Sequence, residues 1–154
     1  NEGQYRRSNC TSVSGLFGAP GQPNYAAAKM CIVGFTLSCA NALNRYGVTS
    51  NAIAPAAATR MTGTIPEDRA AEMGLNPADL APEAVAYPVA YLASEESSWM
   101  NGRVVGARGG RVTLYSNYES ERELVSAQPR TIDTMFREFP RAFDPSKQGL
   151  AGMG

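Results

Sequence analysis

The chain of 154 residues contains no histidine, and this absence excludes more chemistry than any other feature of its composition. Catalytic triads with an imidazole base, histidine-ligated metals and proton transfer by imidazole are all excluded, and we expect no metal site. Cysteine is also scarce: Cys10, Cys31 and Cys39 are odd in number and form no CxxC pair. This pattern predicts three small buried side chains rather than a disulfide framework, in a reducing, cytoplasmic compartment.

Excess charge of one sign and long apolar runs are lacking as well. Fourteen basic residues balance fourteen acidic ones, which argues against non-specific binding to nucleic acids or anionic membranes. No apolar run approaches the length of about eighteen residues that a membrane span needs, and no pattern typical of a secretory signal is visible. We therefore expect neither a nucleic-acid nor a membrane partner. Apolar residues make up 44% of the chain, which is typical of a globular domain.

The first residue is Asn1 rather than Met, and the residues that follow read like the interior of a domain. Two interpretations stay open at this point. The chain is either a fragment of a longer protein or a free-standing one.

A long apolar segment dominates the first half of the chain. Residues 25–46 contain no proline, and Gly47 follows them where a helix C-cap is expected. Apolar side chains occur all round this predicted helix rather than on one stripe. We therefore expect it to be buried on more than one side, against a sheet and against another helix or subunit.

Shorter segments alternate around this helix. Residues 48–54 and 102–107 predict buried strands, the first of them ended by Pro55. Residues 82–94 predict a helix that begins with proline and glutamate. This order of elements is typical of an α/β fold with parallel strands. Any strand in residues 1–12 is predicted to be short or to lie at an edge of the sheet.

The segment after residue 112 has a different pattern. Residues 119–127 and 131–139 predict helices, and the second of these helices has one apolar face. The polar, glycine-containing residues 144–154 are predicted to be disordered.

Tyr25 and Lys29 stand four residues apart at the start of the long helix, so both side chains lie on one face of it. A fixed ammonium beside a phenol favours the phenolate and brings the pKa of the phenol toward neutrality, which suits proton transfer. Ser12 lies thirteen residues before Tyr25, after the expected first strand, and a hydroxyl there could bind a substrate carbonyl. Taken singly, each residue also fits a structural role, such as a turn serine or a solvated lysine.

Three motifs follow one another along the chain. They are Asn9-Cys-Thr-Ser12-x-x-Gly15, Gly21-Gln-Pro-Asn24-Tyr25-Ala-Ala-Ala-Lys29 and Asn51-Ala-Ile-Ala-Pro55. Their order and spacing resemble the second half of a short-chain dehydrogenase/reductase. The resemblance implies an α/β fold that is the C-terminal half of a Rossmann-like doubly wound parallel sheet, with a helical C-terminal tail. On this basis we predict a partial catalytic domain at 1–112, a helical extension at 113–143 and a disordered tail at 144–154.

The resemblance also implies a role for each candidate residue. Tyr25 would transfer a proton to or from a carbonyl, Lys29 would support it and hold the nicotinamide ribose, and Ser12 would orient the carbonyl. The expected cofactor is NAD or NADP, and the expected substrate is a small molecule with a carbonyl or alcohol group. The cofactor site would be lined by Tyr25, Lys29, Pro55, Ala56, Ala58 and Thr59.

The long helix has a further implied role. In the family this helix lies in a four-helix interface, so the resemblance implies a homo-oligomer through residues 25–46.

Some features depart from the family pattern. The glycine-rich turn that grips the adenosine and pyrophosphate, and the family's catalytic asparagine, have no counterpart in this sequence. Residues 4–8 are polar where relatives have an apolar strand. The short loop after Pro55 is similar to that of the (3R)-hydroxyacyl-CoA dehydrogenase domain of multifunctional enzymes, and residues 61–80 would form the substrate lid.

Two functions follow from these observations. In the first, the chain is the C-terminal catalytic part of an NAD(P)-dependent oxidoreductase acting on CH–OH groups, and a 3-hydroxyacyl or 3-oxoacyl thioester is a candidate substrate. In the alternative, it is a catalytically incompetent fragment or a structural, dimerisation partner. The choice of NAD or NADP lies with residues that this sequence does not contain.

Overall fold

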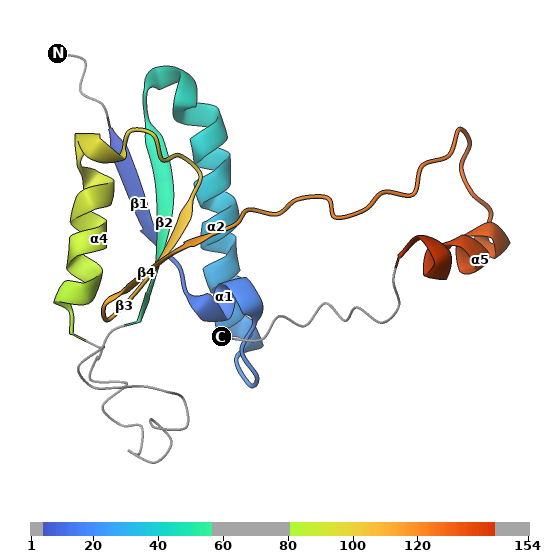
Figure 1. Cartoon of the computed structure of the whole chain (residues 1–154), viewed down its shortest axis with the longest axis horizontal. Helices are drawn as coiled ribbons and strands as arrows, with labels where there is room; N and C mark the ends of the chain where they lie inside the picture. The colour runs from blue at the N-terminus through green and yellow to red at the C-terminus, as the bar shows by residue number, and fades with distance from the viewer. Residues whose placement is uncertain (1–4, 57–80, 144–154) are drawn as a thin grey trace. The chain divides into compact units, whose positions relative to one another are not determined.

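The computed structural model describes residues 5–56 and 81–143 (Figure 1). The chain divides into two compact units, Asn1–Asn117 and Tyr118–Gly154. The expectations for Ala58 and Thr59, for the lid and for the tail at 144–154 lie outside the described residues.

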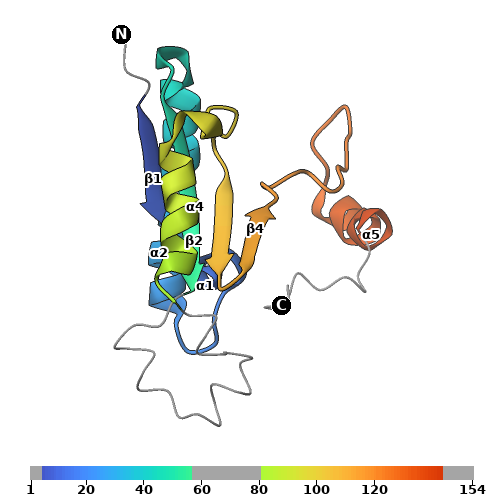
Figure 2. The same cartoon turned by 60° about the vertical axis from the view of Figure 1, so that its left-hand side comes forward.

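The first unit is a four-stranded sheet covered by helices on both faces. Its strands lie in the order β1-β2-β3-β4, with parallel pairing from β1 to β3 and antiparallel pairing between β3 and β4. Figures 1 and 2 show α4 on one side of the sheet and α1 with α2 on the other. We call these sides the α4 face and the α2 face. The elements are β1 Arg6–Cys10, α1 Val13–Phe17, α2 Pro23–Leu43, η1 Asn44–Tyr46, β2 Thr49–Ala56, α4 Glu83–Ala93, η4 Glu95–Ser97, β3 Val104–Arg108 and β4 Arg111–Tyr115.

Side chains alternate between the two faces of the sheet, as strand geometry requires. On the α2 face, Val33 of α2 packs with Ala52 and Ala54 of β2 and with Val104 of β3. On the α4 face, the buried cluster consists of Leu92 of α4 with residues on and just before β3, Val105 and Met100. The sheet is therefore buried on both faces, which is expected of parallel strands flanked by helices.

The long helix predicted at residues 25–46 is confirmed, but its end differs from a regular α-helix. Helix α2 ends at Leu43, the last turn tightens into the 3-10 helix η1, and Gly47 closes it with a positive φ of 72°, the conformation that favours glycine at a C-cap. The expected contact with another helix is found, because α1 packs against α2, but the buried residues of α2, Val33, Thr36 and Ala40, form one stripe. One side packs on the sheet, whereas Phe35, for example, is 50% exposed.

By length and composition alone, the helical segment Pro23–Tyr46 is able to cross a membrane. The core helices of soluble proteins satisfy the same criterion. Here one side of the segment packs against β2, with Val33 and Ala40 buried.

The prediction that Pro55 ends its strand is wrong, because β2 runs on to Ala56 and Pro55 pairs with Ala107 of β3. Proline lacks an N–H donor and is normally excluded from central strands. Here β1 ends opposite Ile53, so among the described residues β3 alone neighbours β2 at Pro55. On the β1 side, the described part of the chain places no strand that would need an N–H from Pro55.

The sequence patterns did not predict strand β4. Two glycines, Gly109 and Gly110, form a two-residue turn, and Gly109 has a φ of 52°, as the first central residue of a hairpin turn can. The strand that follows folds back on β3. The ring of Tyr115 then lies so close to Gly106 that a side chain there would clash, because an added Cβ would be 2.9 Å from Tyr115 Cε2.

The second unit contains one helix among its described residues, α5 Ile132–Ala142. This confirms the helix predicted at 131–139. Thr131 caps it by accepting a hydrogen bond from Thr134 N, and Arg130 forms an ion pair with Glu138 at 2.8 Å. The helix predicted at 119–127 is wrong, because that segment is irregular. It has too few apolar residues to form a stripe, and Val125 is 79% exposed.

The cysteines also differ from expectation. All three are free, but Cys10 and Cys31 are exposed and Cys39 is half-buried. Cys10 lies on the edge strand β1, where side chains have less cover, and Cys31 and Cys39 lie on α2 away from its three buried residues. The prediction that they are buried is therefore wrong.

Candidate active site

The candidate residues gather at the carboxyl ends of β1 and β2. Ser12 comes two residues after β1 ends at Cys10, and Lys29, on the second turn of α2, donates from Nζ to the carbonyl oxygen of Cys10 at 3.2 Å. In open α/β sheets, ligands bind outside the carboxyl ends of the strands. The sequence motifs thus meet where such a fold places its site.

Tyr25 and Lys29 lie on one face of α2, as predicted. The ammonium nitrogen of Lys29 is 5.8 Å from the centre of the Tyr25 ring, within the range of cation–π attraction. Tyr25 is 44% exposed, so this residue is accessible to a bound molecule. Lys29 is half-buried and is held by its bond to β1.

Ser12 caps the short helix α1. Its backbone is extended, and its Oγ accepts a hydrogen bond from the backbone N–H of Ser14 at 3.2 Å. A hydroxyl that accepts one bond keeps its own proton for donation. The cap therefore orients Ser12 and leaves it able to donate to a carbonyl oxygen.

Thr11 is a residue of the site whose role the sequence analysis did not find. It is 1% exposed, its N–H donates to the carbonyl of Ile53 on β2 at 2.8 Å, and its Oγ1 donates to the carbonyl of Lys29 at 2.7 Å. One residue thus links the end of β1 to its neighbouring strand and to α2 at Lys29. A threonine in a short motif carries no sequence signal for this link, because the link depends on where α2 lies.

Gly15 provides the space that this arrangement needs. An added Cβ at Gly15 would lie 2.8 Å from Cβ of Lys29 and 2.9 Å from its carbonyl carbon. Such distances essentially exclude any side chain without movement of the backbone. The absence of a side chain at Gly15 therefore allows α1 to pack directly against α2 beside Lys29.

The predicted cofactor-lining residues are placed only in part. Pro55 and Ala56 end β2 at the same edge of the sheet and are half-buried. Asn51, the first residue of the third motif, lies nearer the amino end of β2, and its side chain has a structural role. Its side chain donates to the carbonyl of Met100 and accepts from the N–H of Arg103, so it fixes the turn that leads into β3.

Comparison with known proteins gives the origin of this arrangement. A family model described as "Enoyl-(Acyl carrier protein) reductase" matches residues 6–111, which include all three motifs. The chain belongs to the short-chain dehydrogenase/reductase family. The resemblance predicted from the motifs is thereby confirmed.

A curated relative supports the same family. Hydroxyacyl-CoA dehydrogenase ChsB1 of Mycobacterium tuberculosis is 39% identical over 150 residues, which are 92% of this chain and 46% of that protein. The chain thus spans about half the length of this curated relative. It is a member of a family whose named relatives are oxidoreductases.

Solved structures show the same fold. A short-chain dehydrogenase from Mycobacterium avium has a TM-score of 0.73 and 32% identity, covering 90% of this chain and 45% of that one. The full-length peroxisomal multifunctional enzyme type 2 of Drosophila melanogaster has a TM-score of 0.66 and 28% identity, covering 97% of this chain and 27% of that one. The predicted Rossmann-like α/β fold class is confirmed.

Proposed function

We propose that this chain supplies the catalytic half of an NAD(P)-dependent oxidoreductase that interconverts a carbonyl and an alcohol. The observation that carries the proposal is the Tyr25–Lys29 pair, held at the carboxyl end of β1 by the bond from Lys29 to Cys10. An ammonium fixed beside a phenol favours the phenolate, so the pair is suited to donate and accept a proton. Ser12 follows the same strand end.

In this mechanism Tyr25 donates its hydroxyl proton to the carbonyl oxygen during reduction and accepts a proton from the alcohol during oxidation. Lys29 stabilises the phenolate that results. Ser12 donates a hydrogen bond to the same substrate oxygen and stabilises the negative charge that develops there. The bound NAD(P) supplies the site where hydride is taken up or released.

The residues present fit a nicotinamide cofactor. An ammonium has three N–H donors, and Lys29 directs one of them to Cys10, so two would remain to hold the ribose hydroxyls. Pro55 and Ala56, at the end of β2, would line the nicotinamide side, and we propose the same for Ala58 and Thr59.

We propose a 3-hydroxyacyl or 3-oxoacyl thioester as substrate, because the relative from Mycobacterium tuberculosis is named a hydroxyacyl-CoA dehydrogenase. We propose a homo-oligomer through α2, since its outward side carries exposed apolar residues such as Phe35. A cytoplasmic location is supported by the three free cysteines.

The decisive experiment is Tyr25→Phe in a protein that contains this chain and is active. We expect turnover to fall about 10²–10⁴-fold, the usual contribution of a positioned acid or base, while NAD(P)H affinity changes less than about threefold. The matched control is Tyr46→Phe, a 64% exposed tyrosine three residues beyond the end of the same helix, which should leave turnover unchanged. Retained activity in Tyr25→Phe would remove Tyr25 from proton transfer.

A structural role is the second candidate, favoured by the chain's coverage of 46% of its relative's length. The chain of 154 residues alone is then expected to bind NADH weakly, because a dinucleotide site needs both halves of the crevice. Fluorescence titration measures this directly. Micromolar NADH binding by the chain alone would contradict the structural role.

A further inference from the structure

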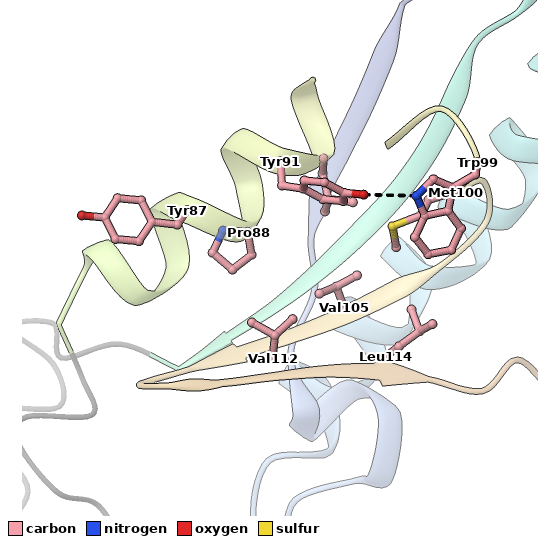
Figure 3. A pocket seen from close by; sticks show the side chains of 9 residues that line it. Tyr87, Pro88, Tyr91, Trp99, Met100, Val105, Val112 and Leu114 are labelled. Atoms are coloured by element: carbon pink, nitrogen blue, oxygen red, sulfur yellow. Dashed lines mark hydrogen bonds between the residues drawn. The ribbon is translucent and has the colours of Figure 1, made fainter. Parts of the chain in front are cut away.

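Tyr115, the last residue of β4, is a half-buried aromatic residue that the proposed chemistry does not use. Strand β4 presents side chains to both faces of the sheet. Val112 and Leu114 line an apolar groove of about 440 Å³ on the α4 face (Figure 3). Because side chains alternate along a strand, Tyr115 lies on the opposite side, the α2 face, together with α1 and α2.

The ring of Tyr115 extends toward the edge of the sheet where the candidate site lies. Tyr115 is paired with Val104 at the start of β3, but its ring reaches diagonally to Gly106. A Cβ added at Gly106 would lie 2.9 Å from Tyr115 Cε2 and 3.0 Å from the tyrosine hydroxyl oxygen. Aromatic side chains are long enough for such diagonal contacts between strands. Gly106 is two residues closer than Val104 to the carboxyl end of β3, so the ring is directed toward that end.

There the ring meets helix α1. The ring centres of Tyr115 and Phe17, the last residue of α1, are 5.7 Å apart, with an angle of 65° between the planes. This edge-to-face arrangement stabilises an aromatic pair. Val13 and Leu16 of α1 pack against the same buried cluster as Tyr115. Helix α1 is therefore held by β4 at its last residue and by α2 at Gly15, where a side chain would clash with Lys29.

The other end of α1 carries Ser12 as its N-cap. The Oγ of Ser12 accepts a hydrogen bond from Ser14 N at 3.2 Å, and its carbonyl oxygen accepts from Gly15 N at 2.9 Å and from Leu16 N at 3.3 Å. The helix has five residues, which corresponds to a length of about 7.5 Å. Over so short a helix, a displacement of Phe17 also displaces the residue that caps the first turn.

We propose that Tyr115 is a positioning residue, which fixes α1 through Phe17 and thereby fixes the hydroxyl of Ser12. This inference rests on the proposed function, which supplies the role of Ser12. The hydrogen bond from Ser12 strengthens as negative charge develops on the substrate oxygen, so a loosely held Ser12 lowers kcat more than it raises KM. A purely structural role would change the amount of folded protein and leave the kcat of the folded molecules unchanged.

The first test removes the ring in an active protein that contains this chain. Since a displacement of about 1 Å in an active site can cost about a hundredfold in rate, we expect Tyr115→Leu to lower kcat at least about tenfold. KM should change less than about threefold. Tyr115→Phe keeps the ring and should retain kcat within about twofold. The control is Leu92→Ala, which removes core packing on the α4 face and should leave the kcat of the folded protein unchanged.

A second variant displaces the ring without altering it. The methyl added by Gly106→Ala would meet the ring at 2.9 Å, so the ring has to move away from its position beside Phe17. We expect kcat to fall, again with little change in KM. The double variant Gly106→Ala with Tyr115→Leu should be no slower than Tyr115→Leu alone, because residues that act through one contact are not additive. Additive losses would contradict the proposal.

Nuclear magnetic resonance relaxation of the 154-residue chain tests the positioning independently of activity. We expect the backbone order parameters of Ser14 and Gly15 to be near the rigid value of about 0.85, and to fall below about 0.6 in Tyr115→Leu. Tyr115→Phe and Leu92→Ala should keep the rigid value. Order parameters that are low in the unchanged chain, or that stay high in Tyr115→Leu, overturn the proposal.

Failure of this inference is distinguishable from failure of the proposed function. The proposed function fails if Tyr25→Phe retains turnover. The positioning role fails if Tyr25→Phe loses turnover while Tyr115→Leu keeps it, or if Leu92→Ala lowers kcat as much as Tyr115→Leu does.

Discussion

The two faces of the sheet are built from the same strands but are organised in different ways. On the α2 face, polar bonds fix the end of β1 to the long helix: Thr11 binds the carbonyl of Lys29, Lys29 binds the carbonyl of Cys10, and Asn9 donates to Thr36 at 3.0 Å. On the α4 face, the buried cluster of Leu92, Met100 and Val105 is apolar, and the hydrogen bond from Trp99 to Tyr91 beside it is exposed.

This difference suits the two faces of the sheet to different roles. Directional hydrogen bonds hold the α2 face in one geometry, which a reaction centre needs. Apolar contact is non-directional, so the α4 face is suited to stabilise the sheet and to associate with another surface. Substitutions on the α2 face should therefore change activity together with stability, whereas those on the α4 face should change stability or association alone.

The largest expected effect is on the α4 face. Leu92 is 2% exposed and forms the core there with Met100 and Val105. We expect Leu92→Ala to lower the free energy of unfolding by about 2–5 kcal/mol, through lost burial and the cavity left behind. Chemical denaturation measures this. Tyr87→Ala, an exposed position on the same helix, is the control and should change the value by less than about 0.5 kcal/mol; equal losses would show that α4 is not anchored by Leu92.

A smaller effect on stability, with a clear effect on activity, is expected at Gly15. The added methyl of Gly15→Ala would meet Lys29 at 2.8 Å, so we expect a loss of about 1–3 kcal/mol in the free energy of unfolding and reduced turnover in an active protein. The control Gly34→Ala lies in α2 with no atom within 4 Å of the added Cβ, and it should stabilise the chain by about 0.5–1 kcal/mol. If turnover is unchanged in Gly15→Ala, the close packing of α1 does not position Lys29 for activity.

The smallest effect is expected at Thr11. Thr11→Val removes the donor to the Lys29 carbonyl while keeping the shape of the side chain, which should cost about 1 kcal/mol, because this carbonyl loses one of its hydrogen bonds. Thr11→Ser keeps the hydroxyl and should restore most of that loss. If Thr11→Val lowers stability but leaves the kinetics of an active protein unchanged, the bond supports the fold and not the site.

Much of the fold was predictable because it depends on local patterns in the sequence. The proline-free apolar segment predicted α2, Gly47 predicted its end, and the alternation of segments predicted parallel strands. Strand β4 was not predictable in the same way. Its five residues alternate between polar and apolar over a short run only, and what makes them a strand is the edge of β3 beside them.

The candidate site was likewise predictable only in part. Ser12, Tyr25 and Lys29 were found from residue type, order and spacing, and their roles stay predictions. Thr11 was missed because its importance comes from a bond to a residue eighteen positions away in the sequence. Gly15 belonged to a motif, but the reason for a glycine became visible only when α1 was seen against Lys29.

The sequence by itself determined the family, the long helix and the placement of a phenol and an ammonium one helical turn apart, because these depend on local spacing along the chain. Only the tertiary structure decided that Lys29 binds the end of β1, that Pro55 continues its strand, and that β4 pairs with β3. These features depend on contacts between distant segments, which exist only once the helices have packed on the sheet.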